Sequence, residues 1–82
     1  NLPSIKVKSK RLNEKINIID LVILSKLENS KSEIRRLIKG RAVKINDKVI
    51  LNEKLIIQDK LFEKNYLKLS IGKKRHIKIE ID

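Results

Sequence analysis

Apolar residues recur with two different periods along this chain. In residues 17–28, and again from residue 31 to about residue 39, they return every three or four positions, as on one face of a helix. Around residues 42–51 and 66–81 they alternate singly with polar residues, as in strands with one buried face. This pattern predicts an α+β fold in which two packed helices, within residues 17–40, join a small, mostly antiparallel sheet of hairpins.

The segment before the first helix is short and mixed. Ile5 and Val7 alternate with lysines and indicate a short strand, and the polar residues 9–15 favour a short helical turn. We assign residues 1–16 to an N-terminal linker with this strand, and residues 17–82 to one domain.

The first helix, predicted over residues 17–28, has its own start signals. Asn17 is a favourable N-cap residue, and Asp20 lies in the first turn, where a carboxylate suits the helix dipole. Its apolar residues fall on two faces: Ile18, Leu21 and Val22 on one, and Ile19 and Ile23 on the other. A helix that is apolar nearly all round needs cover on more than one side, from the N-terminal strand or from a neighbouring domain.

The second helix lies within residues 29–47, the stretch with the densest folding signals. Ser30 and Glu33 match the capping box S-x-x-E, in which the serine hydroxyl accepts a hydrogen bond and the glutamate reaches back. Gly40 stands where a C′ glycine commonly ends a helix. We expect the core-facing arc of this helix to consist of Ile34, Leu37 and Ile38.

The opposite arc of the second helix is basic. It consists of Lys31, Ser32, Arg35, Arg36 and Lys39. Glu33 lies off this arc, so we expect it to leave the positive charge unneutralised. Helix N-termini and arginine side chains both favour phosphate groups. A solvated Lys/Arg face is the alternative interpretation, but the absence of an acidic residue on the arc favours nucleic-acid contact.

The first hairpin, residues 42–51, turns at Asn46 and Asp47. A two-residue loop of this kind favours a type I′ turn, with positive φ at both positions. That register places on one face Val43, Ile45 and Ile50. A longer loop would instead select Val43, Ile45, Val49 and Leu51. We expect the shorter loop.

The rest of the chain predicts more of the sheet. Residues 55–57 indicate a short buried strand, and Leu61 and Phe62 are expected in the core. The second hairpin, residues 66–81, turns at residues 72–74 (Gly-Lys-Lys) and has one apolar and one polar face.

Charge narrows the function. Lysine and arginine total 21 against 10 acidic residues, a formal net charge of +11. Such self-repulsion calls for a polyanionic partner, which leaves nucleic acid, an anionic membrane surface or an acidic protein. No apolar run reaches the length of a transmembrane helix, no signal peptide is evident, and cysteine is absent, so we expect a cytoplasmic location. Because methionine is also absent, we expect a piece of a longer protein.

The sequence predicts no active site on this chain. His76, the only histidine, has no evident partner for metal binding or proton transfer, and we expect no cofactor, metal site or catalytic residue. Only Phe62 and Tyr66 are aromatic, which is too few for recognition of single strands by stacking. We therefore expect binding to RNA through phosphates and shape, with a steep salt dependence.

The segment from Ser30 to Asn46 resembles a known family. Two helices, the second capped and basic, followed by a hairpin resemble the alpha-L RNA-binding motif. Residues 30–33 (S-K-S-E) and 35–38 (R-R-L-I) are similar to the signature S-K-S-E-A-R-R-L-I in the C-terminal domain of bacterial-type tyrosyl-tRNA synthetases. Weaker similarity covers residues 2–5, 19–21 and 72–74.

Three positions depart from that family's pattern. Ile34 replaces the usual alanine, Arg41 stands where a second glycine is common, and Asp47 stands where glycine often follows asparagine. These changes affect packing and turn geometry but leave the basic arc in place.

The resemblance implies an RNA-binding module that docks tRNA-Tyr, by its variable arm and anticodon stem, for a synthetase whose catalytic body is absent from this chain. The alternatives are an rRNA- or ribosome-binding module with the same motif and a basic adaptor for membranes or acidic proteins; the lack of an aromatic anchor face disfavours the membrane. The residues that we expect to contact RNA are Lys31, Ser32, Arg35, Arg36, Lys39, Arg41, Lys44, Lys48, Lys73, Lys74 and Arg75.

Overall fold

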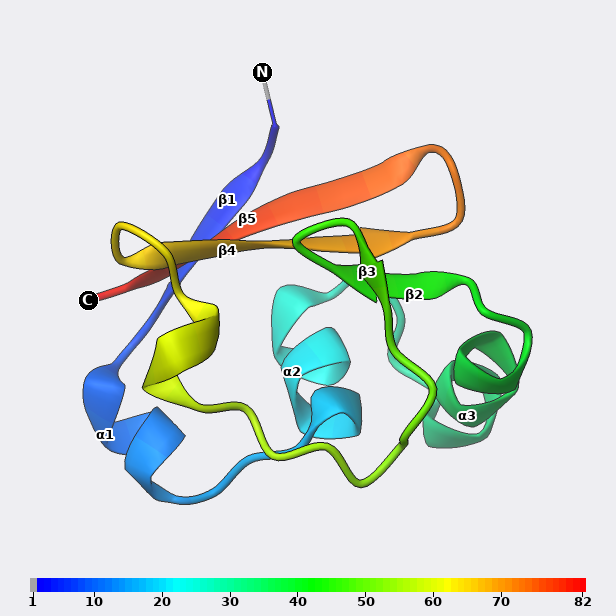
Figure 1. Ribbon diagram of the computed structural model, residues 1–82, viewed down its shortest axis with the longest axis horizontal. Helices are drawn as coiled ribbons and strands as arrows, with labels where there is room; N and C mark the ends of the chain where they lie inside the picture. The colour runs from blue at the N-terminus through cyan, green and yellow to red at the C-terminus, as the bar shows by residue number, and fades with distance from the viewer. Residues whose placement is uncertain (1) are drawn as a thin grey trace.

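One mixed sheet lies over a layer of helices in the computed structural model, which describes residues 2–82 (Figure 1). The α-helices are α1 (Ser9–Asn13), α2 (Ile18–Ser25) and α3 (Lys31–Lys39), with a short 3-10 helix η1 (Asp59–Leu61). The strands are β1 (Ser4–Val7), β2 (Val43–Ile45), β3 (Lys48–Val49), β4 (Tyr66–Ile71) and β5 (Arg75–Ile81). Helix α2 lies under the middle of the sheet, with α1 and α3 on either side of it. The predicted α+β architecture is confirmed.

The sheet has the strand order β1-β5-β4-β2-β3. β1 and β5 are parallel, and the other neighbours are antiparallel, as the hairpin patterns predict. The first hairpin takes the shorter loop, because Ile45 pairs with Lys48 and both loop residues, Asn46 (φ 51) and Asp47 (φ 69), have positive φ. Val49 and Leu51 are accordingly exposed.

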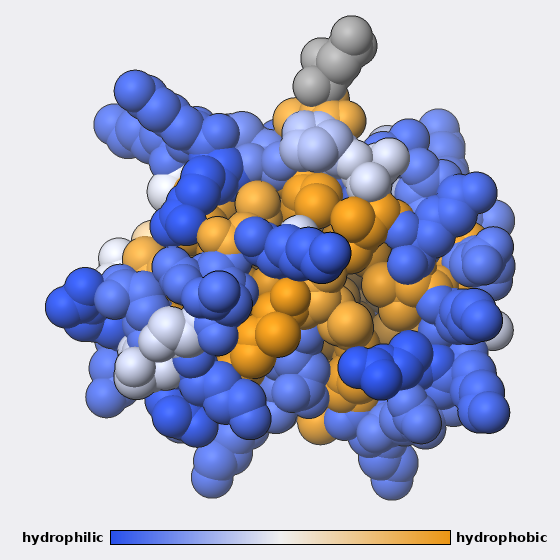
Figure 2. Space-filling view, turned by 180° about the vertical axis from the view of Figure 1, so that it is seen from behind, coloured by the Kyte–Doolittle hydropathy of each residue, from blue (hydrophilic) through white to orange (hydrophobic). Residues whose placement is uncertain are grey.

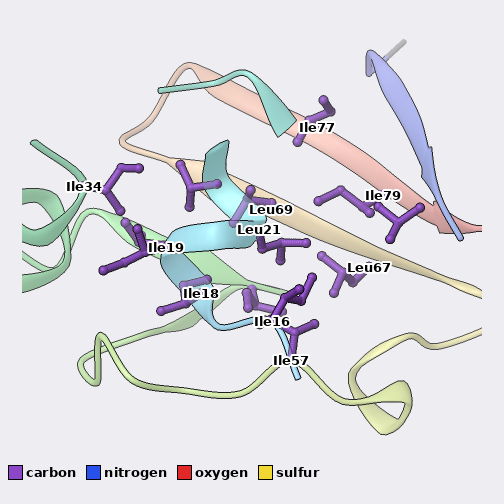
Figure 3. Packing of buried hydrophobic residues seen from close by; sticks show 14 of the residues in the cluster. Ile16, Ile18, Ile19, Leu21, Ile34, Ile57, Leu67, Leu69, Ile77 and Ile79 are labelled. Atoms are coloured by element: carbon purple, nitrogen blue, oxygen red, sulfur yellow. The ribbon is translucent and has the colours of Figure 1, made fainter. Parts of the chain in front are cut away.

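The core fills the space between the sheet and the helices (Figure 3). The sheet contributes Leu67, Leu69 and Ile79 to it, and α2 contributes Ile18 and Leu21; each is fully buried. Helix α3 contributes Ile34 and Ile38. The N-terminal segment belongs to the same core through Val7, Leu12 and Ile16.

Helix α2 is enclosed on more than one side, as its apolar pattern requires. Ile18 and Leu21 are fully buried and Ile19 is 6% exposed, while Ile23 and Leu24 are only partly buried. Figure 2 shows the reverse face of the molecule, where an apolar area is surrounded by hydrophilic side chains.

The structure corrects the bounds of one predicted helix and removes one predicted strand. Helix α2 ends at Ser25 and not at residue 28, because Lys26 takes a left-handed conformation (φ 64) and its N–H bonds to the carbonyl of Ile23. Residues 55–57 form no strand. They make one bridge, between Ile56 and Asn17, since they run beside only the few residues that precede α2. Of these three residues, only the third, at position 57, is buried.

The helix starts are stabilised as capping rules predict, with one exception. At α2, Asn17 and Asp20 form a complete capping box. At α3, the Ser30 hydroxyl accepts a hydrogen bond from the N–H of Glu33 (3.3 Å). The Glu33 carboxylate does not reach back; the N–H of Ser30 donates to Oε1 of Glu28 instead (3.3 Å).

The C-terminus of α3 differs from the prediction by one residue. Gly40 is the C-cap residue with an ordinary φ of −82°, and the left-handed C′ position belongs to Arg41 (φ 62). The N–H of Ala42 bonds to the carbonyl of Leu37 (2.9 Å), and that of Arg41 to the carbonyl of Ile38 (3.1 Å). This is a Schellman motif, which glycine at C′ would form without steric cost.

We predict that Arg41→Gly raises the thermal stability of the domain. A left-handed conformation costs a residue with a Cβ atom about 1 kcal/mol, and its relief should raise the melting temperature by about 4–8 °C, measured by calorimetry. Arg41→Ala is the matched control, because it removes the same charge but keeps the Cβ atom. Equal melting temperatures for the two variants would contradict this explanation.

Candidate nucleic-acid interface

Helix α3 presents a basic face to solvent because its other face is packed. Ile34 and Ile38 are 0% and 1% exposed, which fixes the rotation of the helix about its axis. All residues of the predicted arc are exposed: Lys31, Ser32, Arg35, Arg36 and Lys39. Arg41, in the turn that follows, is exposed as well. The sequence-based orientation of this helix is confirmed.

The expectation that this arc carries no acidic partner is wrong. The Arg36 guanidinium donates to both carboxylate oxygens of Glu33 (2.9 and 2.8 Å). Nε of Arg35 lies 3.7 Å from Oε2 of Glu53, which follows the first hairpin. Glu33 and Arg36 are three residues apart, so a long arginine side chain reaches the carboxylate although the two residues leave the helix in different directions.

These ion pairs lie at the surface. The side chain of Arg36 is 78% exposed and that of Arg35 is 50% exposed. Exposed pairs of this kind contribute only about 0–1 kcal/mol to stability. Each glutamate orients its guanidinium group, and the ion pair is weak enough for a phosphate to replace the carboxylate.

The predicted basic turn of the second hairpin lies beside the loop that leads into α3. The Arg75 guanidinium donates to the carbonyl of Leu27 (2.9 Å) and lies 3.8 Å from Oε2 of Glu28. The other carboxylate oxygen of Glu28 accepts the backbone N–H groups of Asn29 and Ser30, at the start of α3. Arg75 therefore acts as a tether between the hairpin and the start of α3.

The same hairpin also contacts the chain at the other end of α3, just after its C-terminus. The N–H of Gly72 (φ 67) donates to the carbonyl of Ala42, just after the helix (2.8 Å). Lys73 and Lys74 lie in this turn and are exposed. The structure thus joins two basic clusters that are far apart in the sequence.

Two further residues that we expected to contact RNA, Lys44 and Lys48, lie on the first hairpin. Lys44 is partly buried on the sheet face away from the helices, in register with Ser70, and Lys48 is exposed on the edge strand β3. Among residues 2–82, Arg41 takes part in no ion pair, and neither do six of the lysines expected to contact RNA: Lys31, Lys39, Lys44, Lys48, Lys73 and Lys74.

His76 has a structural role that the sequence did not indicate. Its Nε2 lies 2.8 Å from the carbonyl of Lys73, and its Nδ1 lies 2.9 Å from Oγ of Ser70. A carbonyl only accepts, so Nε2 carries the proton and, in the neutral ring, Nδ1 accepts from the serine. This arrangement satisfies the buried hydroxyl and braces the turn. Within residues 2–82, no three His, Cys, Asp or Glu side chains are grouped to hold a metal ion.

A family model named "Tyrosine--tRNA ligase SYY-like C-terminal domain" matches residues 1–79. The chain belongs to this family. A tyrosine–tRNA ligase of Pelagibacter ubique (strain HTCC1062) is 57% identical over 81 residues, which cover 99% of this chain and 20% of that protein. Tyrosine–tRNA ligases of Rickettsia massiliae (strain Mtu5) and Wolbachia pipientis wMel are 42% and 39% identical, each over 82 residues and 20% of its length.

The chain thus spans about a fifth of the length of these relatives. No helix in the described part of this C-terminal domain is both long and apolar enough to cross a bilayer. Among its described residues, the domain displays a positive surface on α3 and on the adjacent hairpin, made of arginines that pair with glutamates and of lysines that take part in no ion pair. This arrangement suits a ligand with regularly spaced negative charges.

Proposed function

We propose that this domain binds tRNA-Tyr for a tyrosine–tRNA ligase, docking on the variable arm and the anticodon stem. The observation that carries the proposal is the 57% identity to the Pelagibacter ligase across 99% of the chain. The basic surface of α3 and of the β4–β5 turn supports it. The tRNA-contacting residues in this proposal are the eleven named above from the sequence.

The arrangement of charges suits a folded RNA stem. Arginine binds a phosphate through two parallel hydrogen bonds, and lysine acts as a mobile point charge. Arg35 and Arg36 lie next to each other on α3, with Lys31 and Lys39 toward the two helix ends. In this proposal the arginines set the register on the RNA backbone and the lysines add affinity from the rim.

We assign the chemistry of the ligase to a catalytic body outside this chain. In this proposal the domain supplies affinity and position for the tRNA, needs no cofactor and works in the cytoplasm. An rRNA-binding role is the alternative, and it differs in the RNA that is preferred.

The first test compares two RNA ligands. Isothermal titration at fixed salt should give tRNA-Tyr an affinity at least about tenfold higher than that of an rRNA stem fragment of equal length, because shape-specific contacts add to the nonspecific charge attraction. Equal affinities would contradict a role specific to tRNA-Tyr.

The second test removes the two arginines of α3. Arg35→Ala with Arg36→Ala should weaken tRNA binding about tenfold or more, and should reduce the slope of log K against log salt by about 1.4–1.8, since two phosphate contacts are lost. Lys10→Ala with Arg11→Ala removes the same charge from α1, at the other end of the helical layer (Figure 1). If both double variants bind alike, only net charge matters and the α3 face is not the interface.

The third test releases Arg36 from its carboxylate. Glu33→Gln should raise the affinity for tRNA about two- to fivefold, because the phosphate no longer displaces a charged partner worth up to about 1 kcal/mol. Glu14→Gln is the matched control, since Glu14 also pairs with an arginine three residues away, Arg11, on α1. An equal gain in both variants would show a general charge effect and no competition at α3.

A further inference from the structure

Tyr66 borders a surface hollow that lies away from the α3 face. The hollow has a volume of about 430 Å³, within the range of small-ligand sites. Its walls are the turn between β2 and β3, the 3-10 helix η1 with the loop after it, and the first residues of β4. Ile45, Ile50 and Leu61 supply an apolar lining.

The side chain of Asn46 holds these walls together. Its Nδ2 donates to the carbonyl of Leu61 in η1 (2.9 Å), and its Oδ1 accepts the backbone N–H of Lys68 in β4 (3.0 Å). Its own N–H donates to the carbonyl of Lys68 (2.9 Å). Because one side chain connects turn, η1 and β4, the hollow is a preformed feature of the fold.

The charges that line the hollow nearly balance. Its acidic residues are Asp47 and Glu63, and Nζ of Lys68 lies 3.4 Å from the Asp47 carboxylate. The lysines that line it are Lys48, Lys60 and Lys68. The balance is one positive charge, so the hollow is only weakly basic, and charge alone gives a ligand little reason to bind there.

The ring of Tyr66 supplies a second attraction. Tyr66 is 38% exposed, and it is the only aromatic residue among the exposed large hydrophobic residues of the described chain. The ammonium of Lys78 lies 4.5 Å from the ring centroid, a cation–π contact that favours this position of the ring. A planar group that enters the hollow therefore meets an aromatic residue next to lysines.

We propose that this hollow receives one unpaired nucleotide of the bound RNA, with its base stacked on Tyr66 and its phosphate beside Lys48, Lys60 or Lys68. This inference rests on the proposed RNA-binding function and adds a base-contacting subsite to it. A single ring cannot form a platform for a run of bases, but it is sufficient for one base that leaves its stack. The subsite would recognise a bulged or looped-out position in an otherwise paired stem.

The chain carries its own reporter for this subsite. Tyr66 is the only tyrosine and tryptophan is absent, so the tyrosine fluorescence of the protein comes from this ring alone. Two RNA hairpins of equal length are titrated, one fully paired and one with a single bulged nucleotide. The bulged hairpin should quench the fluorescence and the paired hairpin should not, after correction for RNA absorption with free tyrosine amide.

Variants of Tyr66 test the contribution to affinity, measured by anisotropy of end-labelled hairpins. Tyr66→Leu should weaken binding of the bulged hairpin about tenfold and leave the paired hairpin unchanged, because one stacked base is lost. Tyr66→Phe keeps the ring and should bind as the parent does. Circular dichroism verifies that each variant is folded.

The outcomes separate the two proposals. If both hairpins bind without quenching and Tyr66→Leu changes neither affinity, the subsite is wrong and the RNA-binding function stands. If neither hairpin nor tRNA-Tyr binds, the proposed function itself fails. Quenching by the bulged hairpin together with unchanged affinity in Tyr66→Leu would also overturn the stacking contact, since the ring would then sense binding without contributing to it.

Discussion

The burial of Ile34 and Ile38 is the constraint on which the rest of the surface depends. Both side chains are almost fully enclosed, so α3 has only one rotation about its axis that avoids exposing them. That rotation turns Arg35 and Arg36 outward. The second hairpin then holds the backbone before and after the helix: Arg75 donates to the carbonyl of Leu27, and Gly72 donates to the carbonyl of Ala42. The apolar core therefore determines where the positive charge of the domain is displayed.

Arginines and lysines have different roles on this surface. Arg35, Arg36 and Arg75 each lie within 4 Å of a glutamate, whereas the neighbouring lysines of the described chain have no such partner. A planar guanidinium group must be oriented to form two parallel hydrogen bonds with an anion, whereas a mobile ammonium group acts as a point charge and needs no fixed orientation. The glutamates also place negative charge beside three arginines, which lowers the local repulsion on this surface.

Sequence reasoning succeeded for several local features. Asn17 caps α2, and Asn46 and Asp47 form the two-residue turn, as predicted. The capping box predicted at Ser30 and Glu33 formed only by half, because the N–H of Ser30 donates to Glu28. It failed where the partners are distant in sequence: Arg75 and the carbonyl of Leu27 are 48 residues apart, and Asn46 and Lys68 are 22 apart. The pair of Glu33 and Arg36 was local and was still missed, because assigning residues to helix faces ignores the reach of a long side chain.

Several residues other than glycine have a positive φ in this domain, and they differ in whether their side chains form contacts that stabilise the fold. Arg41, Asn46 and Asp47 all adopt left-handed conformations that glycine would adopt without steric cost. Asparagine and aspartate tolerate this conformation better than most residues, and here both side chains form contacts, Asn46 with η1 and β4 and Asp47 with Lys68. Arg41 forms no ion pair within the described residues, and its charge extends the basic face beyond the last turn of α3. Glycine at position 46 or 47 would lose these contacts, whereas glycine at position 41 would lose only the positive charge. The end of α3 requires the left-handed conformation at position 41 but does not require an arginine there, so folding alone does not account for this residue.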